Sequence, residues 1–299
     1  MPYLRNLLPA LGPWRRVWII RALMVGILLG LGGCTALRLS YNNAETLALW
    51  WMDDYFDFDK TQTERVRADL ADMARWHRRD ELPLLAELLE SAQALAQKQP
   101  DATQICAVYE RGLLRMQALA EHALPAMAAV APTLRPSQLK NLAAHYDKSN
   151  RKWREEWLTT DTDTLDKRTQ KVRERLEDFY GSLNPGQWRQ LQQRMAASGL
   201  DEAQLYRERV RRQQEALRTL DGLRGDSAVS AQTALGKLMK EYFQSSDPAY
   251  RAYRDRSVTQ TCETMAQLHA SATPQQRSNL VRKLQAYAQD VQVLMTQSP

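Results

Sequence analysis

His77 and Glu81 are the two side chains whose spacing comes closest to a catalytic or metal-binding arrangement. They lie four residues apart in a stretch of helical character, so they would share one face of a helix, as metal ligands or an acid/base pair would. Neither a second histidine at helical spacing nor an evident third ligand is nearby. The surrounding charges before Pro83 are also typical of a solvated helix end, and the sequence favours that interpretation.

Asp53, Asp54, Asp57 and Asp59 form an acidic cluster that could bind a hard cation through oxygen atoms. An EF-hand loop requires glycine at its sixth position, and counting from Asp57 that position is Gln62. The cluster is therefore not that loop. We expect it to serve the local structure, with Asp59 at a helix N-terminus.

A face that combines aromatic and basic character is predicted around Trp153. Asn150 and Arg154 are four residues apart, as are Trp153 and Trp157, so the two pairs lie on overlapping faces of one helix. Such a face could bind a peptide or an anionic headgroup by aromatic contact and charge. The alternative is a core stripe of tryptophans bordered by salt bridges. We take these four residues as the candidate partner-binding site.

Cys106 and Cys262 both fall on apolar helical faces. An oxidising compartment would allow a disulfide bond between them, but two buried free thiols fit the sequence equally well. Both possibilities remain open from the sequence.

Long helices must position these residues, because the apolar positions recur at helical spacing and no useful stretch alternates as a strand would. The predicted helices span residues 59–79, 83–95, 102–131, 136–158, 162–180, 185–197, 201–222, 228–244, 248–270 and 274–295. Glycine and proline are scarce after residue 33. We therefore predict an all-α fold, an elongated multi-helix bundle of about nine or ten helices, with a possible sub-domain joint near 221–227.

Residues 1–33 have the character of an export signal. They contain four arginines and no acid, and an apolar run of about ten residues follows, too short for a comfortable membrane span. The run ends at Leu31-Gly-Gly-Cys34, which resembles the lipobox of bacterial lipoproteins. That resemblance implies cleavage before Cys34, lipidation of Cys34, including palmitate, and, with Thr35 following, a place at the outer membrane. Residues 34–299 would then form one helical periplasmic domain.

The net charge argues against a nucleic-acid partner once the signal is removed. The chain has 41 basic and 35 acidic residues, a formal charge of +6. Four of the basic residues belong to residues 1–33, which leaves 37 against 35. The basic character thus belongs mostly to the signal.

One local motif recurs with glutamine at its end. Its four copies end at Gln62, Gln138, Gln187 and Gln276, and their starts are 76, 49 and 89 residues apart. A solenoid requires a fixed period, so these are not structural repeats. An oxygen-bearing N-cap, a proline at the first helical position and a glutamine three residues after the cap predict capping boxes that need no ligand.

Two resemblances follow from these residues. The Leu-x-Pro-x-Gln frame is similar to the LTxxQ motif of the Spy and CpxP periplasmic chaperones, which are much shorter. The stretches Tyr41-Asn-Asn43, Trp50 to Gln62, Trp76 to Pro83 and Asn150 to Glu156, with the lipobox, resemble a family of uncharacterised proteobacterial lipoproteins grouped under a domain of unknown function. That likeness implies an all-helical envelope protein and carries no established activity.

We therefore expect a lipid-anchored protein on the periplasmic face of the outer membrane that acts in binding, as a scaffold or like a chaperone, and not as an enzyme. Its expected partners are the membrane, and envelope proteins or unfolded clients; no cofactor or metal is expected. The alternative is a metal-dependent or hydrolytic envelope enzyme that uses His77, Glu81, Asp53 and Asp57.

Overall fold

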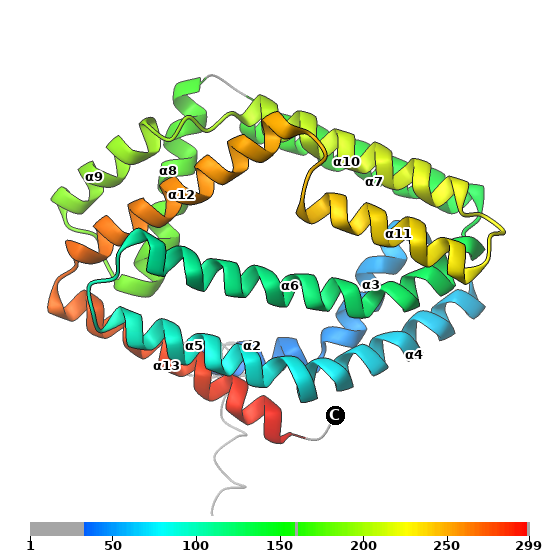
Figure 1. Ribbon diagram of the computed structural model, residues 1–299, viewed down its shortest axis with the longest axis horizontal. Coiled ribbons are helices and arrows are strands. Elements are labelled where there is room, and N and C mark those ends of the chain that lie inside the picture. The colour runs from blue at the N-terminus through cyan, green and yellow to red at the C-terminus, as the bar shows by residue number, and fades with distance from the viewer. Residues whose placement is uncertain (1–32, 159–160, 298–299) are drawn as a thin grey trace, which may run out of the picture. The chain divides into compact units, whose positions relative to one another are not determined.

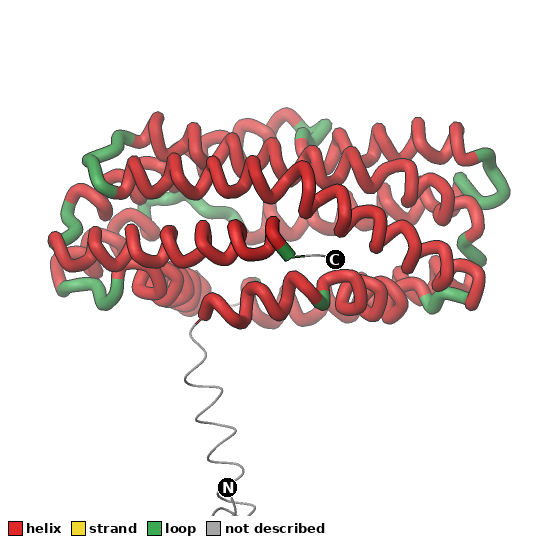
Figure 2. The backbone as a smooth tube through the Cα atoms, turned by 90° about the horizontal axis from the view of Figure 1, so that it is seen from below, coloured by secondary structure: helices red, strands yellow, loops and turns green. Residues whose placement is uncertain are grey.

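The computed structural model describes residues 33–158 and 161–297, and these residues are helices joined by short loops (Figure 2). No strand occurs among them, so the all-α prediction is confirmed. The signal segment 1–33 lies outside the described residues except for its last glycine, which begins helix α2 (Gly33–Asn42). Within the described residues, no helix is both long enough and apolar enough to span a bilayer.

The chain divides into two compact units, Met1–Asn43 and Ala44–Pro299. The second unit holds eleven α-helices, numbered α3 to α13 in Figure 1. Their bounds are α3 Ala44–Phe56, α4 Lys60–Trp76, α5 Leu82–Ala96, α6 Ala102–Val130, α7 Pro136–Trp157, α8 Asp161–Tyr180, α9 Pro185–Ala196, α10 Glu202–Gly222, α11 Ala228–Phe243, α12 Pro248–Ala270 and α13 Pro274–Thr296. A π-helical turn, His77–Glu81, joins α4 to α5, and a 3₁₀ turn, Ala131–Thr133, follows α6.

The second unit has one helix more than the ten predicted ranges, and this additional helix is α3. None of its residues is fully buried, and apolar side chains occur all round it, so no single apolar stripe marks it in the sequence. The ten other helices correspond to the ranges predicted from the periodicity. Helix α4 ends at Trp76, and the chain reaches α5 through the π-helical turn without a loop.

The helices pack mostly in pairs that lie side by side. Helix α5 packs along α13, α7 along α10, and α6 against both α11 and α12 (Figure 1). Helix α3 contacts α4 and α7, and α8 contacts α9 and α13. Helices distant in sequence are thus neighbours in the second unit, and its core forms between them.

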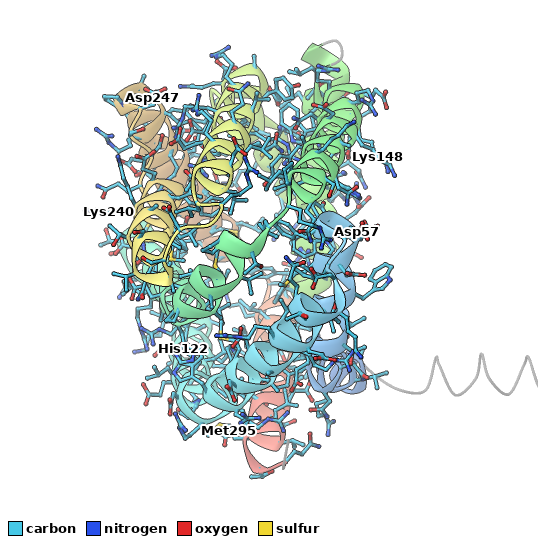
Figure 3. The ribbon with its side chains drawn as sticks, turned by 90° about the vertical axis from the view of Figure 1, so that its right-hand side faces the viewer. Asp57, His122, Lys148, Lys240, Asp247 and Met295 are labelled. Carbon is cyan, nitrogen blue, oxygen red and sulfur yellow. A yellow bond between two sulfur atoms is a disulfide. The ribbon has the colours of Figure 1, made fainter. Side chains whose placement is uncertain are left out.

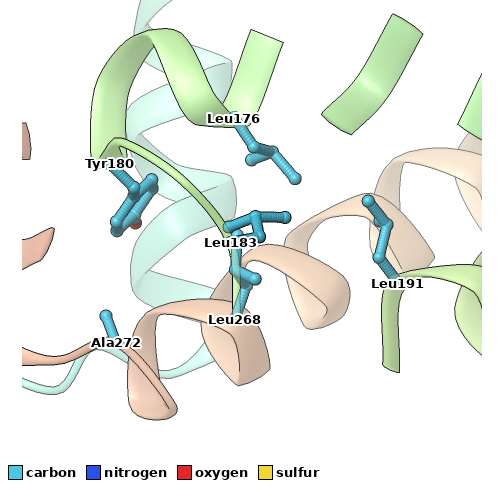
Figure 4. Close-up of a cluster of buried hydrophobic side chains, with 6 residues drawn as sticks. All are labelled: Leu176, Tyr180, Leu183, Leu191, Leu268 and Ala272. Atoms are coloured by element: carbon cyan, nitrogen blue, oxygen red, sulfur yellow. The ribbon is translucent and has the colours of Figure 1, made fainter. Parts of the chain in front are cut away.

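Two clusters of buried apolar side chains lie in this unit. The first, shown in Figure 4, contains Leu176, Tyr180, Leu183, Leu191, Leu268 and Ala272. The second contains Ala128, Ala131, Leu223, Ala231 and Leu235. The 221–227 link takes part in the second cluster through Leu223, and the Gly225 amide donates to the Pro132 carbonyl at 3.0 Å.

Candidate functional site

The recurring glutamines pair across helices. Gln62, at the start of α4, and Gln138, at the start of α7, are both buried, and each amide nitrogen donates to the amide oxygen of the other, at 3.3 and 2.7 Å. Gln62 also donates to the Thr133 carbonyl, and Gln138 donates to the Asp57 carbonyl, each at 3.0 Å. We call this pair the N-terminal clasp.

Gln187 and Gln276 form an equivalent C-terminal clasp between α9 and α13. Their side-chain amides bond reciprocally at 2.9 Å in each direction. Gln187 also donates to the Ser271 carbonyl at 3.1 Å, and Gln276 donates to the Ser182 carbonyl at 2.9 Å. In both clasps each glutamine thus donates to the carbonyl five residues before its partner, so the two share one geometry.

Capping boxes are present at the three motifs that begin with an oxygen-bearing N-cap, so that prediction is confirmed. The side chains of Asp59, Asn184 and Thr273 accept from the amide three residues ahead, and the glutamine there accepts from the cap amide. At the fourth motif the cap is Arg135, whose side chain has no acceptor; its backbone amide donates to the Gln138 side chain at 2.8 Å, so only that half of the box is present. The motifs therefore serve helix initiation and helix pairing together.

Neighbouring helices contact all four residues of the aromatic and basic face on α7, and the proposed partner binding there remains a prediction. Asn150 is buried and donates to Gln213 at 2.7 Å. Trp153 stacks on Tyr206 of α10, with ring centroids 5.4 Å apart.

The other two residues of that face have partners as well. Arg154 is exposed and donates to the Tyr206 hydroxyl at 3.2 Å. Trp157 is half-buried, and the Arg168 guanidinium and the Lys171 ammonium group lie 4.5 and 4.4 Å from its ring centroid. The four predicted residues therefore hold α7 against α10 and α8.

His77 and Glu81 lie in the π-helical turn between α4 and α5. Burial lowers the pKa of His77, and the nearby Glu81 charge opposes that shift. Glu81 is buried and forms an ion pair with Arg115 of α6 at 3.3 Å. The carboxylate of Glu81 is thus held by a helix that the sequence reasoning had not connected with it.

The four aspartates have local structural roles. Asp53 accepts from the Phe58 amide at 3.0 Å, Asp54 lies 3.6 Å from His145, and Asp59 caps α4. Asp57, labelled in Figure 3, has a φ of 50°, a left-handed conformation that aspartate tolerates. No group of three or more metal-ligating side chains with a suitable arrangement occurs in the described residues. The enzyme alternative remains a prediction.

Cys106 of α6 and Cys262 of α12 are joined by a disulfide bond in the structure. Their Cα atoms lie 5.6 Å apart, and 156 residues of chain separate them. Of the two possibilities left open by the sequence, the structure contains the bonded one. The bond ties together two helices that also pack on each other.

An open apolar cavity of about 560 Å³ lies among α4, α6, α7, α10 and α11. Its lining is almost wholly apolar, and four methionines contribute to it: Met73, Met116, Met127 and Met239. Met116 is 57% exposed and Met127 is 45% exposed, so part of the lining faces solvent. Other apolar lining side chains are Leu119, Ala120, Ala123, Leu235, Leu238 and Phe243, and the polar lining side chains include Arg211, Arg212, Gln213, Glu215 and Glu241.

The two arginines that line the cavity are paired with carboxylates of the protein. Arg211 and Arg212 both hold Glu208, which is buried, through hydrogen bonds of 2.7 to 2.9 Å. Burial alone would raise the pKa of Glu208, but the hydrogen bonds from the two arginines lower it to about 2. The Tyr242 and Tyr250 rings flank the Arg212 guanidinium. These charges are thus satisfied within the protein.

Sequence reasoning did not predict this cavity. Its lining residues come from five helices, and in the sequence the apolar ones look like parts of ordinary apolar stripes. The one available signal was the number of methionines, ten in the whole chain, because methionine is common at surfaces that accommodate varied apolar ligands.

A family model for DUF6279, described as a family of unknown function, matches residues 54–251. This chain belongs to DUF6279. The match covers about two thirds of the 299 residues and contains every residue that lines the cavity. No curated protein and no solved structure matches the chain.

The DUF6279 match contains three of the four clasp glutamines, and Gln276 lies beyond it. Cys34 and α3 up to Asp53 precede it, and Cys262 follows it. The family description carries no activity, so any functional conclusion must come from the geometry of the chain.

Proposed function

We propose that this DUF6279 member is a non-enzymatic binding protein of the periplasm, anchored to the outer membrane through a lipid on Cys34, and that its cavity binds the acyl chain of an envelope lipid. The observation that carries the proposal is the open apolar cavity among α4, α6, α7, α10 and α11. The lipobox-like residues before Cys34 support the anchor.

The size and lining of the cavity suit an apolar chain. A volume of about 560 Å³ lies within the range of roughly 300–1,000 Å³ typical of small-molecule sites. Methionine side chains are unbranched and flexible, so they can adapt to acyl chains of different length and saturation. Burial of methylene groups contributes about 0.8 kcal/mol each, so apolar contact alone can hold such a ligand.

The paired arginines that line the cavity favour a ligand whose buried part is uncharged. Arg211 and Arg212 are occupied by Glu208, and Arg211 also lies 3.8 Å from Glu241. A strongly anionic ligand would have to compete with these carboxylates for the two arginines. An acyl chain makes no such demand, because its headgroup can remain in solvent.

Binding of a fluorescent polyene fatty acid tests the proposal. Ala123 lines the cavity on α6, so Ala123→Phe places a ring inside it. Ala107 is exposed on the same helix and does not line the cavity, so Ala107→Phe is the matched control. We expect the first substitution to weaken binding at least about tenfold and the second to leave it unchanged.

Equal binding by wild type and Ala123→Phe would overturn the acyl-chain assignment. A chaperone-like role is tested in parallel by aggregation of an unfolded client. If wild type slows aggregation, Ala123→Phe does not, and the fatty acid fails to bind, the occupant is a peptide and the acyl-chain proposal fails. The mass of the purified protein reports separately whether Cys34 carries acyl groups.

A further inference from the structure

Helix α3 carries apolar side chains on two opposite faces. The face toward the rest of the unit contains Leu49, Met52, Tyr55 and Phe56, which are half-buried. Tyr55 packs against the His145 ring of α7, with centroids 4.8 Å apart. This face accounts for how α3 is held to α4 and α7.

The opposite face is exposed and carries three large apolar side chains beside the carboxylate of Asp54. Leu47, Trp50 and Trp51 follow one another at helical spacing, with 52%, 71% and 55% of their surfaces accessible. Large side chains that are this exposed and this close together are unusual on a surface that faces only water. Two adjacent tryptophans favour a bilayer interface, where the ring lies among the headgroups and the indole N–H remains hydrated.

The position of α3 in the chain, close to Cys34, indicates what this face contacts. Trp50 lies sixteen residues after Cys34, the proposed site of lipid attachment, so even an extended chain would span no more than about 55 Å between them. Helical segments, such as α2 and α3 themselves, shorten that reach further. The tryptophan face is therefore confined to the neighbourhood of the bilayer in an anchored protein.

We infer that Leu47, Trp50 and Trp51 form a membrane-contact surface that lies in the headgroup region of a phospholipid bilayer. This inference rests on the proposed anchor for its location and is independent of the cavity. A second attachment point beside the lipid would restrict the orientation of the second unit relative to the bilayer.

The charge of α3 indicates which phospholipids it contacts. The helix carries Glu45, Asp53 and Asp54 and no lysine or arginine. It therefore has no attraction for anionic headgroups, and contact comes from insertion of the apolar side chains. We expect a preference for zwitterionic phospholipid and little sensitivity to salt.

Tryptophan quenching by brominated lipid tests the surface in the whole protein. Full-length protein is expressed with its own N-terminal segment, purified in detergent and reconstituted into phosphatidylcholine vesicles brominated near the headgroup. Eight tryptophans occur in the chain and two of them, Trp14 and Trp18, precede Cys34, so Trp50 and Trp51 are two of six in the processed protein. We expect contact quenching to remove up to about a third of the emission.

A pair of variants assigns the quenching to α3. Trp50→Phe/Trp51→Phe keeps an apolar surface but removes the reporters, so the quenching is expected to disappear. Trp153→Phe/Trp188→Phe removes two half-buried tryptophans of other helices, so it is expected to keep the quenched component. Equal quenching of wild type and Trp50→Phe/Trp51→Phe overturns the inference, as does quenching that grows with anionic lipid and falls with salt.

The anchor is read out separately by the mass of the same purified protein. If the protein is acylated but its α3 tryptophans are not quenched, the membrane-contact surface is contradicted and the lipid anchor is supported. If the α3 tryptophans are quenched in protein that lacks acyl groups, the membrane-contact surface is supported and the lipid anchor of the proposed function is contradicted.

Discussion

The two glutamine clasps can be compared atom by atom. In each clasp two buried side-chain amides bond reciprocally, and each also donates to the carbonyl five residues before its partner. An asparagine three residues after the second glutamine adds a further bond: Asn141 donates to the Tyr55 carbonyl at 3.0 Å, and Asn279 donates to the Tyr180 carbonyl at 2.9 Å. Both tyrosines lie seven residues before the first glutamine.

The surroundings of the two clasps differ. The C-terminal clasp lies beside the cluster in Figure 4, where the Tyr180 hydroxyl lies 3.0 Å from Nδ1 of His269. At the N-terminal clasp Tyr55 packs against His145 ring to ring, and an ion pair joins Arg135 to Asp59 at 2.6 Å. The two clasps therefore share the hydrogen bonds of their glutamine amides but differ in the side chains that surround those amides.

The comparison explains why the motif spacing looked irregular in the sequence. The first copy pairs with the second and the third with the fourth, so the glutamines within a pair are 76 and 89 residues apart. Closing a longer loop costs only about 0.6 kcal/mol per doubling of its length, so unequal connections are tolerated. The recurring unit is therefore a pair of helix N-termini joined by their glutamines, and the unit does not require a fixed spacing in the sequence.

The largest expected effect comes from the disulfide between α6 and α12. Helix α6 precedes α7, which carries one glutamine of the N-terminal clasp, and α12 precedes α13, which carries one glutamine of the C-terminal clasp. Cys106→Ser should lower the free energy of unfolding by about 4 kcal/mol, because the bond closes a loop of more than 100 residues. Denaturant unfolding with and without reductant measures the loss.

Reductant should lower the midpoint of the wild type and leave Cys106→Ser unchanged. Nonreducing and reducing gels give an independent readout. Identical mobility of the wild type in both gels, together with equal midpoints, would show that the thiols are free in the purified protein.

The next effect tests whether the two clasps are equivalent. Gln138→Ala removes the bonds of Gln138 with the Gln62 amide, the Asp57 carbonyl and the Arg135 amide. Gln276→Ala removes the corresponding bonds with the Gln187 amide, the Ser182 carbonyl and the Thr273 amide. We expect each to cost about 2–4 kcal/mol, measured by urea unfolding.

Double variants separate pairing from general destabilisation. Gln187→Ala/Gln276→Ala should cost less than the sum of its two single changes, because both remove the same bonds. Gln138→Ala/Gln276→Ala affects different clasps and should be additive. An additive result for the first double variant would contradict reciprocal pairing.

The smallest effect concerns pH and belongs to the C-terminal clasp. Nε2 of His269 donates to the Lys98 carbonyl at 2.9 Å, so Nδ1 is the acceptor for Tyr180, and burial lowers the pKa of this imidazole. As the pH falls below about 6.5, histidine in the unfolded chain gains a proton that native His269 does not. Stability should therefore fall toward acid, by at most about 1.4 kcal/mol per pH unit.

His269→Asn should make this dependence shallower, measured as the unfolding free energy between pH 7 and 5. His77, whose pKa burial also lowers, remains in both proteins, so the difference isolates His269. Parallel pH profiles for wild type and variant would show that His269 becomes protonated in the native state as readily as in the unfolded state.

Much of the fold could be predicted from local pattern. Ten helices follow from periodicity, and three complete capping boxes follow from the residue types at the helix starts. Helix α3 could not be found in this way, because large apolar side chains occur on its exposed face as well as on its packed face. The signal that identifies amphipathic helices is absent where a helix has two apolar sides.

The candidate sites were much harder to predict. The face around Trp153 was read correctly as a shared helix face, but only the packing of α10 shows that Tyr206 covers it. Glu81 was expected at a solvated helix end, although it is buried and forms an ion pair with Arg115 of α6. In both places the partners of a side chain come from helices that are distant in sequence, so local spacing could not identify them.

The sequence by itself determined the helices, their caps and the lipobox-like segment, since these depend on residues within a few positions of one another. Only the tertiary structure decided how the four glutamines pair, which thiols meet and where the apolar cavity opens. Each of these depends on long-range packing of helices, and apolar burial is non-directional, so many pairings would satisfy the same pattern. The reciprocal amide bonds distinguish the native pairing from the others, because a buried glutamine without its partner is costly.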